Sequence, residues 1–321
     1  MIWHSEFLPQ EVRLVKGNEE SPAGVDIRDG SVYVWTEDTV LTVNIAIRTG
    51  RPLLVCGGPG TGKSSLASFV ARTMHWNYFE QVITSKSEAK ELLWNFDSIR
   101  RLRDAYRKGD VSDLNYVEPR ALWWSFNAGE AQRQVEKIQA SLPAGSVGPI
   151  PPGELRGVDR PSVLLLDELD KADPDLPNDL LVTLGSQQFR VTDTGQLIKR
   201  RSTPLVMITS NDDRILPRAF IRRCIILTLS PPSPTQLVEI AKAHFPSDAE
   251  RNQTLFSRVA ERIRELHKDS DPTQGTSAAE YLDAVRACLK YEVRPPGVSE
   301  TASPIWQAIE SAVLIKRQHD D

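Results

Sequence analysis

The sequence predicts an α/β fold in which a doubly wound parallel sheet is followed by a small α-helical domain. Short apolar runs bounded by turn residues recur along the first two thirds of the chain, and such runs are typical of strands buried on both faces of a parallel sheet. Helical patterns separate them, as in doubly wound domains. After about residue 230 only helical patterns remain. We therefore expect a sheet domain over residues 1–230, with an N-terminal extension at about 1–30, and a helical domain over 231–321.

The expected strands span residues 51–57, 78–84, 161–170, 204–212 and 224–230. The helices expected between them include residues 63–74 and 178–187. Two stretches outside this alternation, residues 88–108 and 121–139, each predict one amphipathic helix. Residues 189–202 hold Asp-Thr-Gly between β-rich flanks and predict a hairpin. Prolines within 229–236 would end the last strand at a domain boundary.

Composition narrows the class of protein without naming a partner. The net charge of −4 and pI near 5.8 disfavour a globally basic nucleic-acid binder, although the basic run at 198–201 keeps local binding open. The cysteines at 56, 224 and 288 are too far apart in sequence to form a paired zinc motif. The chain starts without a signal-peptide pattern and contains no apolar run of about 18 residues. We expect a cytoplasmic protein without membrane insertion.

The stretch GGPGTGKS, residues 57–64, follows the first expected strand and precedes a helical pattern. Glycines let backbone amides turn toward a phosphate without a Cβ clash, and the N-terminus of the following helix favours an anion. Lys63 is suited to reach the β- and γ-phosphates, and the Ser64 hydroxyl is suited to ligate Mg²⁺. The sequence thus predicts a triphosphate-binding loop made of Gly57, Gly58, Pro59, Gly60, Thr61, Gly62, Lys63, Ser64 and Ser65.

A pair of acidic residues ends the strand expected at 161–170. Asp167 follows a run of leucines and is suited to hold Mg²⁺, while Glu168 is suited to orient or deprotonate an attacking water. An acidic pair at this place could also be a solvated strand end or a helix cap. Together with the glycine loop it favours a nucleotide-hydrolysing site over a simple nucleotide holder.

Two more segments could complete such a site. Asn211 follows another apolar strand, and its amide is suited to hold the attacking water, although a lone asparagine is also a common turn residue. The arginines of LPRAFIRRC, residues 216–224, could pair within their own subunit or reach a neighbour's nucleotide as an arginine finger. The second alternative makes activity depend on an oligomer.

Taken together, GGPGTGKS, VLLLDELDKAD, TSND and LPRAFIRRC, in this order and with a helical tail, resemble the AAA+ ATPases. Residues 86–116 and 189–202 stand where the MoxR-like and dynein/midasin-related branch carries an insert in helix 2 and a hairpin before sensor 1. The resemblance implies a P-loop NTPase core with an α-helical lid, and it implies ATP and Mg²⁺ as cofactors.

The resemblance also implies a role for individual residues. It assigns the Walker A role to Lys63 and Ser64 and the metal-binding Walker B role to Asp167. Glu168 becomes the catalytic residue and Asn211 becomes sensor 1. A finger acting on a neighbouring subunit falls on Arg223, with Arg222 as the alternative. The chain departs from the family at the start of the lid helix, where no arginine comes before Arg286. Either Arg286 serves as the lid sensor from a later turn of the helix, or lid sensing is weak.

The function implied by the resemblance is Mg²⁺-dependent ATP hydrolysis by a hexameric ring that remodels a protein client, such as one with a von Willebrand factor A domain. The alternative is a nucleic-acid motor with residues 198–201 in a pore-facing hairpin, or a slow nucleotide-controlled switch in a defence or signalling system. Glu168 argues against a pure switch. Trp123 and Trp124 are adjacent on an expected helix, so we expect one in the core and one at a subunit seam.

Overall fold

The structure is a computed structural model, and it describes residues 6–8, 30–107, 111–211, 213–266, 277–296 and 302–315. The chain forms two compact units. The described part of the first unit comprises residues 6–8, 37–55, 67–107, 111–211 and 213–227. The described part of the second comprises residues 30–36, 56–66, 228–266, 277–296 and 302–315.

A six-stranded sheet forms the centre of the first unit, and its strands run in the order β10-β1-β9-β6-β2-β5. The strands are β1 (Leu53–Cys56), β2 (Asn77–Val82), β5 (Gly153–Glu154), β6 (Ser162–Asp167), β9 (Leu205–Ser210) and β10 (Ile225–Thr228). The pairs β2–β6 and β6–β9 are parallel, whereas β5 pairs antiparallel at the edge of the sheet. Every residue of β6 and β9 is buried, as expected for strands covered on both faces. The predicted parallel-sheet α/β fold is confirmed.

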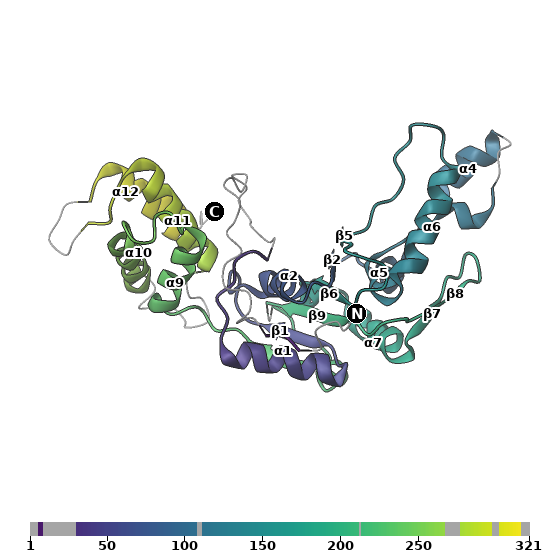
Figure 1. The fold of residues 1–321 in the computed structure, drawn as a ribbon, viewed down its shortest axis with the longest axis horizontal. Helices are drawn as coiled ribbons and strands as arrows, with labels where there is room; N and C mark the ends of the chain where they lie inside the picture. The colour runs from purple at the N-terminus through teal and green to yellow at the C-terminus, as the bar shows by residue number, and fades with distance from the viewer. Residues whose placement is uncertain are drawn as a thin grey trace. The chain divides into compact units, whose positions relative to one another are not determined.

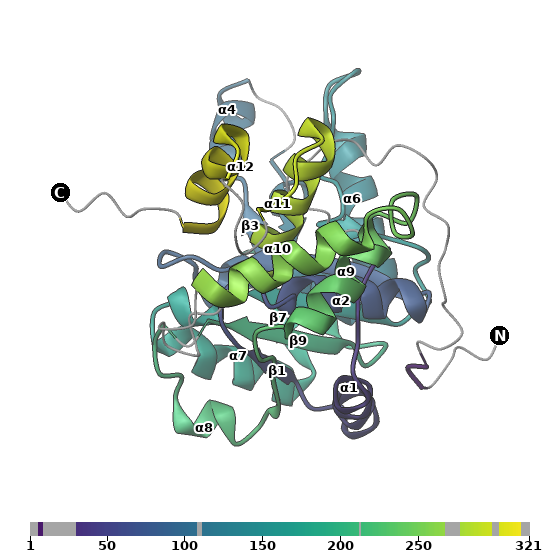
Figure 2. The ribbon, with the colours of Figure 1, turned by 90° about the vertical axis from the view of Figure 1, so that its left-hand side faces the viewer.

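Helices cover the two faces of this sheet. α2 (Lys63–Thr73) lies on one face, and α1 (Glu37–Thr49) and α7 (Asp175–Ser186) lie on the other (Figures 1 and 2). Two short helices of the core are η3 (Leu169–Lys171), which follows β6, and α8 (Arg218–Ile221), which precedes β10. Thr36, the residue before α1, is exposed. Near the N-terminus, Phe7 packs edge-on against Phe69 of α2, with ring centroids 5.9 Å apart.

The stretch between β2 and β5 forms a long insert that packs on the sheet through its helix α5. It consists of α3 (Ala89–Leu93), β3 (Trp94–Phe96), α4 (Ser98–Tyr106), η2 (Asp113–Tyr116), β4 (Val117–Pro119), α5 (Ala121–Phe126) and α6 (Ala128–Ser141). The single helix expected over 88–108 is therefore wrong, because residues 94–96 are extended and pair antiparallel with β4. The buried Trp94 explains the break: its ring stacks on Phe189 at 5.9 Å, and its indole N–H donates to Asp193 at 2.8 Å.

The helix expected over 121–139 is also divided. Asn127 ends α5 and caps α6, since its side chain accepts a hydrogen bond from the Glu130 N–H at 3.1 Å. Trp123 and Trp124 on α5 are both buried, at 0% and 1% exposure. Trp124 contacts Phe79 of the sheet, whereas Trp123 contacts Phe189 from the other side. The prediction that one of them lies at a subunit seam is wrong, because both sides of this short helix are covered.

The hairpin predicted over 189–202 is confirmed. β7 (Gln188–Arg190) pairs antiparallel with β8 (Leu197–Lys199), with Phe189 opposite Ile198. These two side chains are buried, and the residues on either side of them are exposed. The alternation follows the twofold period of a half-buried strand.

The second unit contains the C-terminal helices α9 (Pro234–His244), α10 (Gln253–Leu266), α11 (Ala278–Tyr291), α12 (Pro304–Ile309) and η5 (Glu310–Ile315). Serine caps begin three of them, at Ser233, Ser277 and Ser303. The core of this unit includes Phe256, Val259, Tyr281, Val285 and Trp306. The Tyr281 hydroxyl donates to the Phe256 carbonyl at 3.1 Å, and burial raises its pKa. The predicted C-terminal helices are confirmed. Within the described residues, no helix has the length and apolar character needed to cross a membrane.

Candidate functional site

The loop Gly57–Ser64 joins β1 to α2 and lies in the second unit. Its backbone depends on glycine: φ is +148° at Gly57, +71° at Gly60 and +88° at Gly62, a region that residues with a Cβ rarely occupy. A Cβ at Gly57 would lie 2.4 Å from the Leu229 carbonyl oxygen, and one at Gly60 would lie 1.9 Å from the Ser277 Cβ. The loop therefore admits no side chain at these two positions.

Lys63 lies inside this loop and is only 7% exposed. Its ammonium donates to the carbonyl oxygens of Gly57 at 2.7 Å and Gly58 at 2.8 Å. The Thr61 hydroxyl also donates to the Gly58 carbonyl, at 3.0 Å. A buried cation beside the first turn of a helix makes the concave side of the loop attractive to an anion.

Two features of the second unit flank the loop. The Ala278 N–H of α11 donates to the Gly60 carbonyl at 3.0 Å, so the N-terminus of α11 contacts the loop. Tyr33 lies on another side, where a Cβ at Gly62 would be 3.3 Å from its ring. Burial raises the pKa of the Tyr33 hydroxyl. Sequence reasoning missed Tyr33, because an isolated tyrosine upstream of the loop has no recognisable pattern.

Arg286 does not lie at the loop end of α11. It comes eight residues after Ala278, which corresponds to about 12 Å along a helix axis. Its guanidinium donates to Asp283 at 2.8 Å and lies over the Phe245 ring at 5.9 Å. The residues at the loop end of α11 are instead Ser277 and Glu280, which form a capping box.

In the first unit, the carboxyl end of β6 is tied to β9 by one hydroxyl. Thr209 Oγ1 donates to Asp167 Oδ1 at 2.6 Å and accepts the Glu168 N–H at 2.8 Å. Asp167 and Thr209 are 4% and 0% exposed. Glu168 itself has φ +63°, in the left-handed region. The hydroxyl thus fixes the orientation of one carboxylate and the strained backbone of the next residue.

A second carboxylate holds the segment that follows β9. Asp170 is 2% exposed, and its Oδ2 accepts the N–H groups of Asn211 at 3.0 Å and Asp213 at 3.1 Å. Its Oδ1 is buried and has no hydrogen-bond partner among the described residues. Sequence reasoning missed both Thr209 and Asp170, although each lies within three residues of a predicted site residue.

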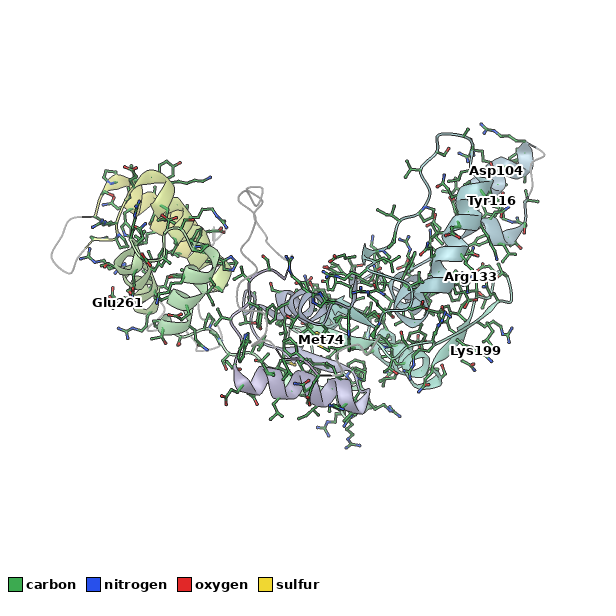
Figure 3. The ribbon with its side chains drawn as sticks, viewed as in Figure 1. Met74, Asp104, Tyr116, Arg133, Lys199 and Glu261 are labelled. Atoms are coloured by element: carbon green, nitrogen blue, oxygen red, sulfur yellow. The ribbon has the colours of Figure 1, made fainter. Side chains whose placement is uncertain are left out.

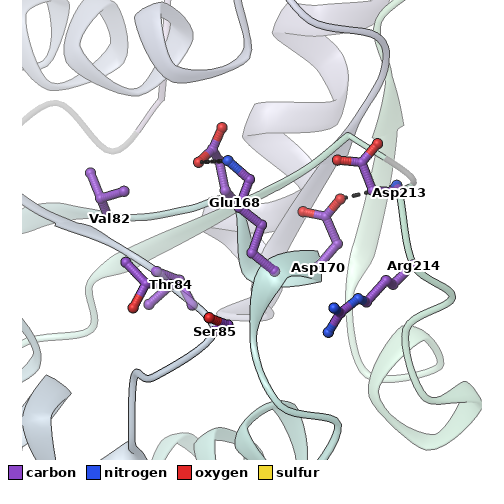
Figure 4. Close-up of a pocket in the computed structure, with 9 residues that line it drawn as sticks. Val82, Thr84, Ser85, Glu168, Asp170, Asp213 and Arg214 are labelled. Atoms are coloured by element: carbon purple, nitrogen blue, oxygen red, sulfur yellow. Dashed lines mark hydrogen bonds and ion pairs between the residues drawn. The ribbon is translucent and has the colours of Figure 1, made fainter. Parts of the chain in front are cut away.

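The Glu168 side chain faces a cavity of about 460 Å³ (Figure 4). Its Oε2 lies 2.6 Å from Lys171 Nζ, and this hydrogen bond raises the pKa of Lys171. The cavity lining also includes Thr84, Asp213 and Arg214. The Glu168 and Lys171 side chains are 31% and 47% exposed, so solvent reaches the pair.

The candidate finger residues follow α8, and the side chains of Arg222 and Arg223 are exposed. Their backbone is held by Arg51, whose guanidinium donates to the carbonyl oxygens of Arg222 at 2.6 Å, Arg223 at 3.1 Å and Cys224 at 3.0 Å. The Arg223 guanidinium itself makes a long hydrogen bond to the Ala219 carbonyl, at 3.4 Å. Arg51 therefore fixes the segment while leaving both candidate side chains accessible.

The predicted site residues are thus distributed over the two units. Asp167, Glu168 and Asn211 come together in the first unit, and the arginines at 222 and 223 belong to the same unit. The predicted phosphate-binding loop belongs to the second unit, where it contacts the start of α11.

Comparisons with known proteins identify a family match. A family model described as "AAA domain (dynein-related subfamily)" matches residues 52–237. No curated protein matches the chain. Similar solved structures include a single-residue mutant of Thermotoga maritima RuvB, at 14% identity and a TM-score of 0.45, covering 85% of this chain and 67% of that one. They also include the Thermotoga maritima RuvB Holliday junction branch migration motor, at 15% identity and a TM-score of 0.40, covering 84% and 65%. The chain spans about two thirds of the length of these structures, and the likeness is too weak to indicate a function.

Proposed function

The chain belongs to the dynein-related subfamily of AAA domains, and from this premise we propose that it is a Mg²⁺-dependent ATPase whose hydrolysis cycle remodels a protein partner. The observation that carries the proposal is the hydrogen bond between Thr209 and Asp167, which continues to the backbone of Glu168. A side chain that ties a metal-binding carboxylate to the residue after it is expected where both must keep a fixed geometry.

The residues present fit ATP and Mg²⁺. The loop Gly57–Ser65 has glycines in conformations that residues with a Cβ rarely adopt, and the buried Lys63 ammonium supplies positive charge to it. The Ser64 hydroxyl and the Asp167 carboxylate are hard oxygen donors, the kind that Mg²⁺ prefers. When bound, Mg²⁺ neutralises the charge that develops on the transferred phosphoryl group.

Glu168 is the proposed general base. Its carboxylate accepts the proton of the attacking water, while Thr209 keeps its backbone in place. Lys171 donates to Oε2 of the same carboxylate at 2.6 Å and restrains its position. The Asn211 amide orients the water, and Asp170 positions Asn211 by accepting its backbone N–H. Asp170 and Thr209 act in this scheme as positioning residues.

Arg223, or alternatively Arg222, is proposed to act on the nucleotide of a neighbouring copy in a hexameric ring. An exposed guanidinium on a backbone fixed by Arg51 supports such a role. The proposed client is a protein, with a von Willebrand factor A domain as one candidate. The MoxR-like branch and a cytoplasmic location are part of the same proposal, as is the division into a core over 1–230 and a lid over 231–321.

A nucleic-acid motor is the second candidate, and the exposed Lys199 on the β7–β8 hairpin favours it (Figure 3). Two neighbouring arginines are already engaged, since Arg190 donates to the Gly195 carbonyl at 2.7 Å and Arg201 pairs with Asp159 at 3.0 Å. The Asp159 carboxylate thus offsets one positive charge of the run 198–201, which favours the protein client.

The proposal is tested by measuring ATP hydrolysis by the purified chain with Mg²⁺, with excess chelator, and with single- or double-stranded DNA. We expect hydrolysis that requires Mg²⁺ and is not stimulated by DNA. Hydrolysis stimulated by DNA and lost as salt rises would instead support the nucleic-acid motor. Absence of Mg²⁺-dependent hydrolysis at all protein concentrations would refute both.

A further inference from the structure

Helix α4, in the insert, exposes its apolar side chains. Ile99, Leu102 and Tyr106 are 82%, 58% and 82% exposed, and their spacing places them on one face of the helix. None of the residues of α4, all of which the structure describes, is buried. A surface helix normally turns its apolar stripe inward and its charged residues outward. We call the surface of Ile99, Leu102, Arg103, Tyr106 and Arg107 the α4 face.

The charged side of α4 is the side that is packed. The Arg100 side chain is only 10% exposed, and its guanidinium lies over the Tyr116 ring at 4.7 Å. Arg101 donates to Asp113 of η2 at 2.6 Å. The Tyr116 hydroxyl donates to Asp104 at 3.2 Å, and the two side chains lie together near the end of the insert (Figure 3). The helix therefore packs against the rest of the insert through its polar side, and its apolar stripe faces solvent.

Further contacts hold α4 in place. Asp97 caps the helix by accepting the Arg100 N–H at 2.9 Å, and η2 packs against both α4 and α6. Contiguous exposed apolar side chains rimmed by polar ones are typical of interaction sites. Side chains held at fixed helical spacing suit a partner with matching spacing.

The charges of the rim indicate the chemistry of the partner. Arg103 and Arg107 are exposed beside the stripe. Arg103 also lies 3.5 Å from Asp104 Oδ1, an exposed pair that contributes little and that a partner carboxylate can replace, while the other oxygen of Asp104 accepts the hydrogen bond from Tyr116. We propose that the α4 face binds an amphipathic helix of a protein partner, whose apolar side chains contact Leu102 and its neighbours and whose acidic side chains pair with the two arginines. Binding of a helix to a membrane surface scales with the apolar area that it buries, and a stripe of three side chains offers little such area.

This inference deepens the proposed function, because it names the chemistry of the protein partner. It rests on the proposed function only for the expectation that binding is coupled to ATP hydrolysis. The binding itself depends on the α4 face alone, so the two can fail separately.

The test measures fluorescence anisotropy of labelled synthetic peptides on the full chain. One peptide forms an amphipathic helix of about three turns with leucines on one face and glutamates on the other, and the second carries lysines in place of the glutamates. We expect the glutamate peptide to bind, with affinity that falls as salt rises, and the lysine peptide to bind at least about tenfold more weakly. Equal binding of both peptides, or no binding of either, overturns the inference.

Two variants locate the binding. Leu102→Glu is expected to lower the affinity for the glutamate peptide by about tenfold or more. Val182→Glu, at a 70% exposed position on α7, should leave that affinity unchanged. The double variant Arg103→Glu with Arg107→Glu should reverse the preference and favour the lysine peptide. Circular dichroism and peptide-free ATP hydrolysis should match the unmodified chain in all three.

Three results contradict the inference outright. They are unchanged peptide binding in Leu102→Glu, a change of oligomeric mass in Leu102→Glu, and binding of phosphatidylcholine/phosphatidylserine vesicles that Leu102→Glu abolishes. The second result would assign the α4 face to another copy of the chain, and the third would assign it to a lipid surface. If the unmodified chain binds the peptide but does not hydrolyse ATP, the result counts against the proposed function and leaves the α4 face supported.

Discussion

The Thr209 hydroxyl bridges two strands by donating to Asp167 at 2.6 Å, and the same oxygen accepts the Glu168 N–H at 2.8 Å. One buried side chain thus serves the proposed metal ligand and the proposed general base. Because the proton and one lone pair of the hydroxyl serve these two neighbours, its removal affects both at once.

Replacing Thr209 with valine keeps the shape and removes the hydroxyl. We expect Thr209→Val to lower Mg²⁺-dependent hydrolysis by about 10- to 100-fold and to lower the free energy of unfolding by about 1–3 kcal/mol, because the Glu168 N–H loses its acceptor. Thr209→Ser, which keeps the hydroxyl, should retain most of the hydrolysis rate and most of the stability. The measurements are a Mg²⁺ titration of turnover and denaturant unfolding. A valine variant as active as the serine variant would show that the bridge has no role.

Asp170 is expected to act through Asn211. Asp170→Ala leaves the N–H groups of Asn211 and Asp213 without their acceptor, so turnover should fall by about tenfold or more while nucleotide affinity stays the same. Asp170→Asn keeps an oxygen acceptor and should retain more activity. Turnover and equilibrium nucleotide binding are measured side by side. Parallel loss of binding and turnover would mean that Asp170 only maintains the fold.

Lys171 is expected to restrain the Glu168 carboxylate. Lys171→Met removes the hydrogen bond at 2.6 Å and should raise basal hydrolysis by about two- to fivefold. The effect is small because the pair is exposed to solvent. Lys171→Arg preserves the charge and serves as the matched control. A lower rate in Lys171→Met than in Lys171→Arg would show that the lysine assists hydrolysis instead.

Arg223 is expected to act on the nucleotide of a neighbouring subunit rather than to maintain the fold. Arg223→Ala should abolish turnover without weakening ATP affinity, and mixing it with Lys63→Ala should restore part of the activity, because each variant supplies what its neighbour lacks. Arg51→Ala should lower turnover less, since it loosens only the backbone of Arg222 and Arg223. If the mixture stays inactive, the finger acts within its own subunit or the chain does not assemble as proposed.

Much of the fold could be predicted, because buried parallel strands are continuous apolar runs. β6 and β9 fall within residues 161–170 and 204–212, and the C-terminal helices begin where the strand signals end. The helix expected over 88–108 failed because its helical periodicity continues through Trp94–Phe96, while tertiary contacts of Trp94 with Phe189 and Asp193 make that segment extended. Contacts between residues about a hundred positions apart leave no local pattern.

The candidate site could be predicted in part for a similar reason. Lys63 and Asp167 belong to motifs whose spacing carries chemical meaning, whereas Thr209 and Arg51 act through partners that are distant in sequence. Adjacent tryptophans misled the prediction, since a short helix covered on two sides can bury both Trp123 and Trp124. The orientation of α4 could not be anticipated either, because amphipathicity does not tell which face is packed.

The central claim is that Lys63 and Glu168 serve one nucleotide in separate roles. Its most direct test measures ATP affinity and ATP turnover for the unmodified chain, Lys63→Ala and Glu168→Gln under the same conditions. We predict that Lys63→Ala loses ATP binding, whereas Glu168→Gln binds ATP as tightly as the unmodified chain but does not turn it over. Equal loss of binding in both variants, or unmodified turnover in Glu168→Gln, would contradict the account.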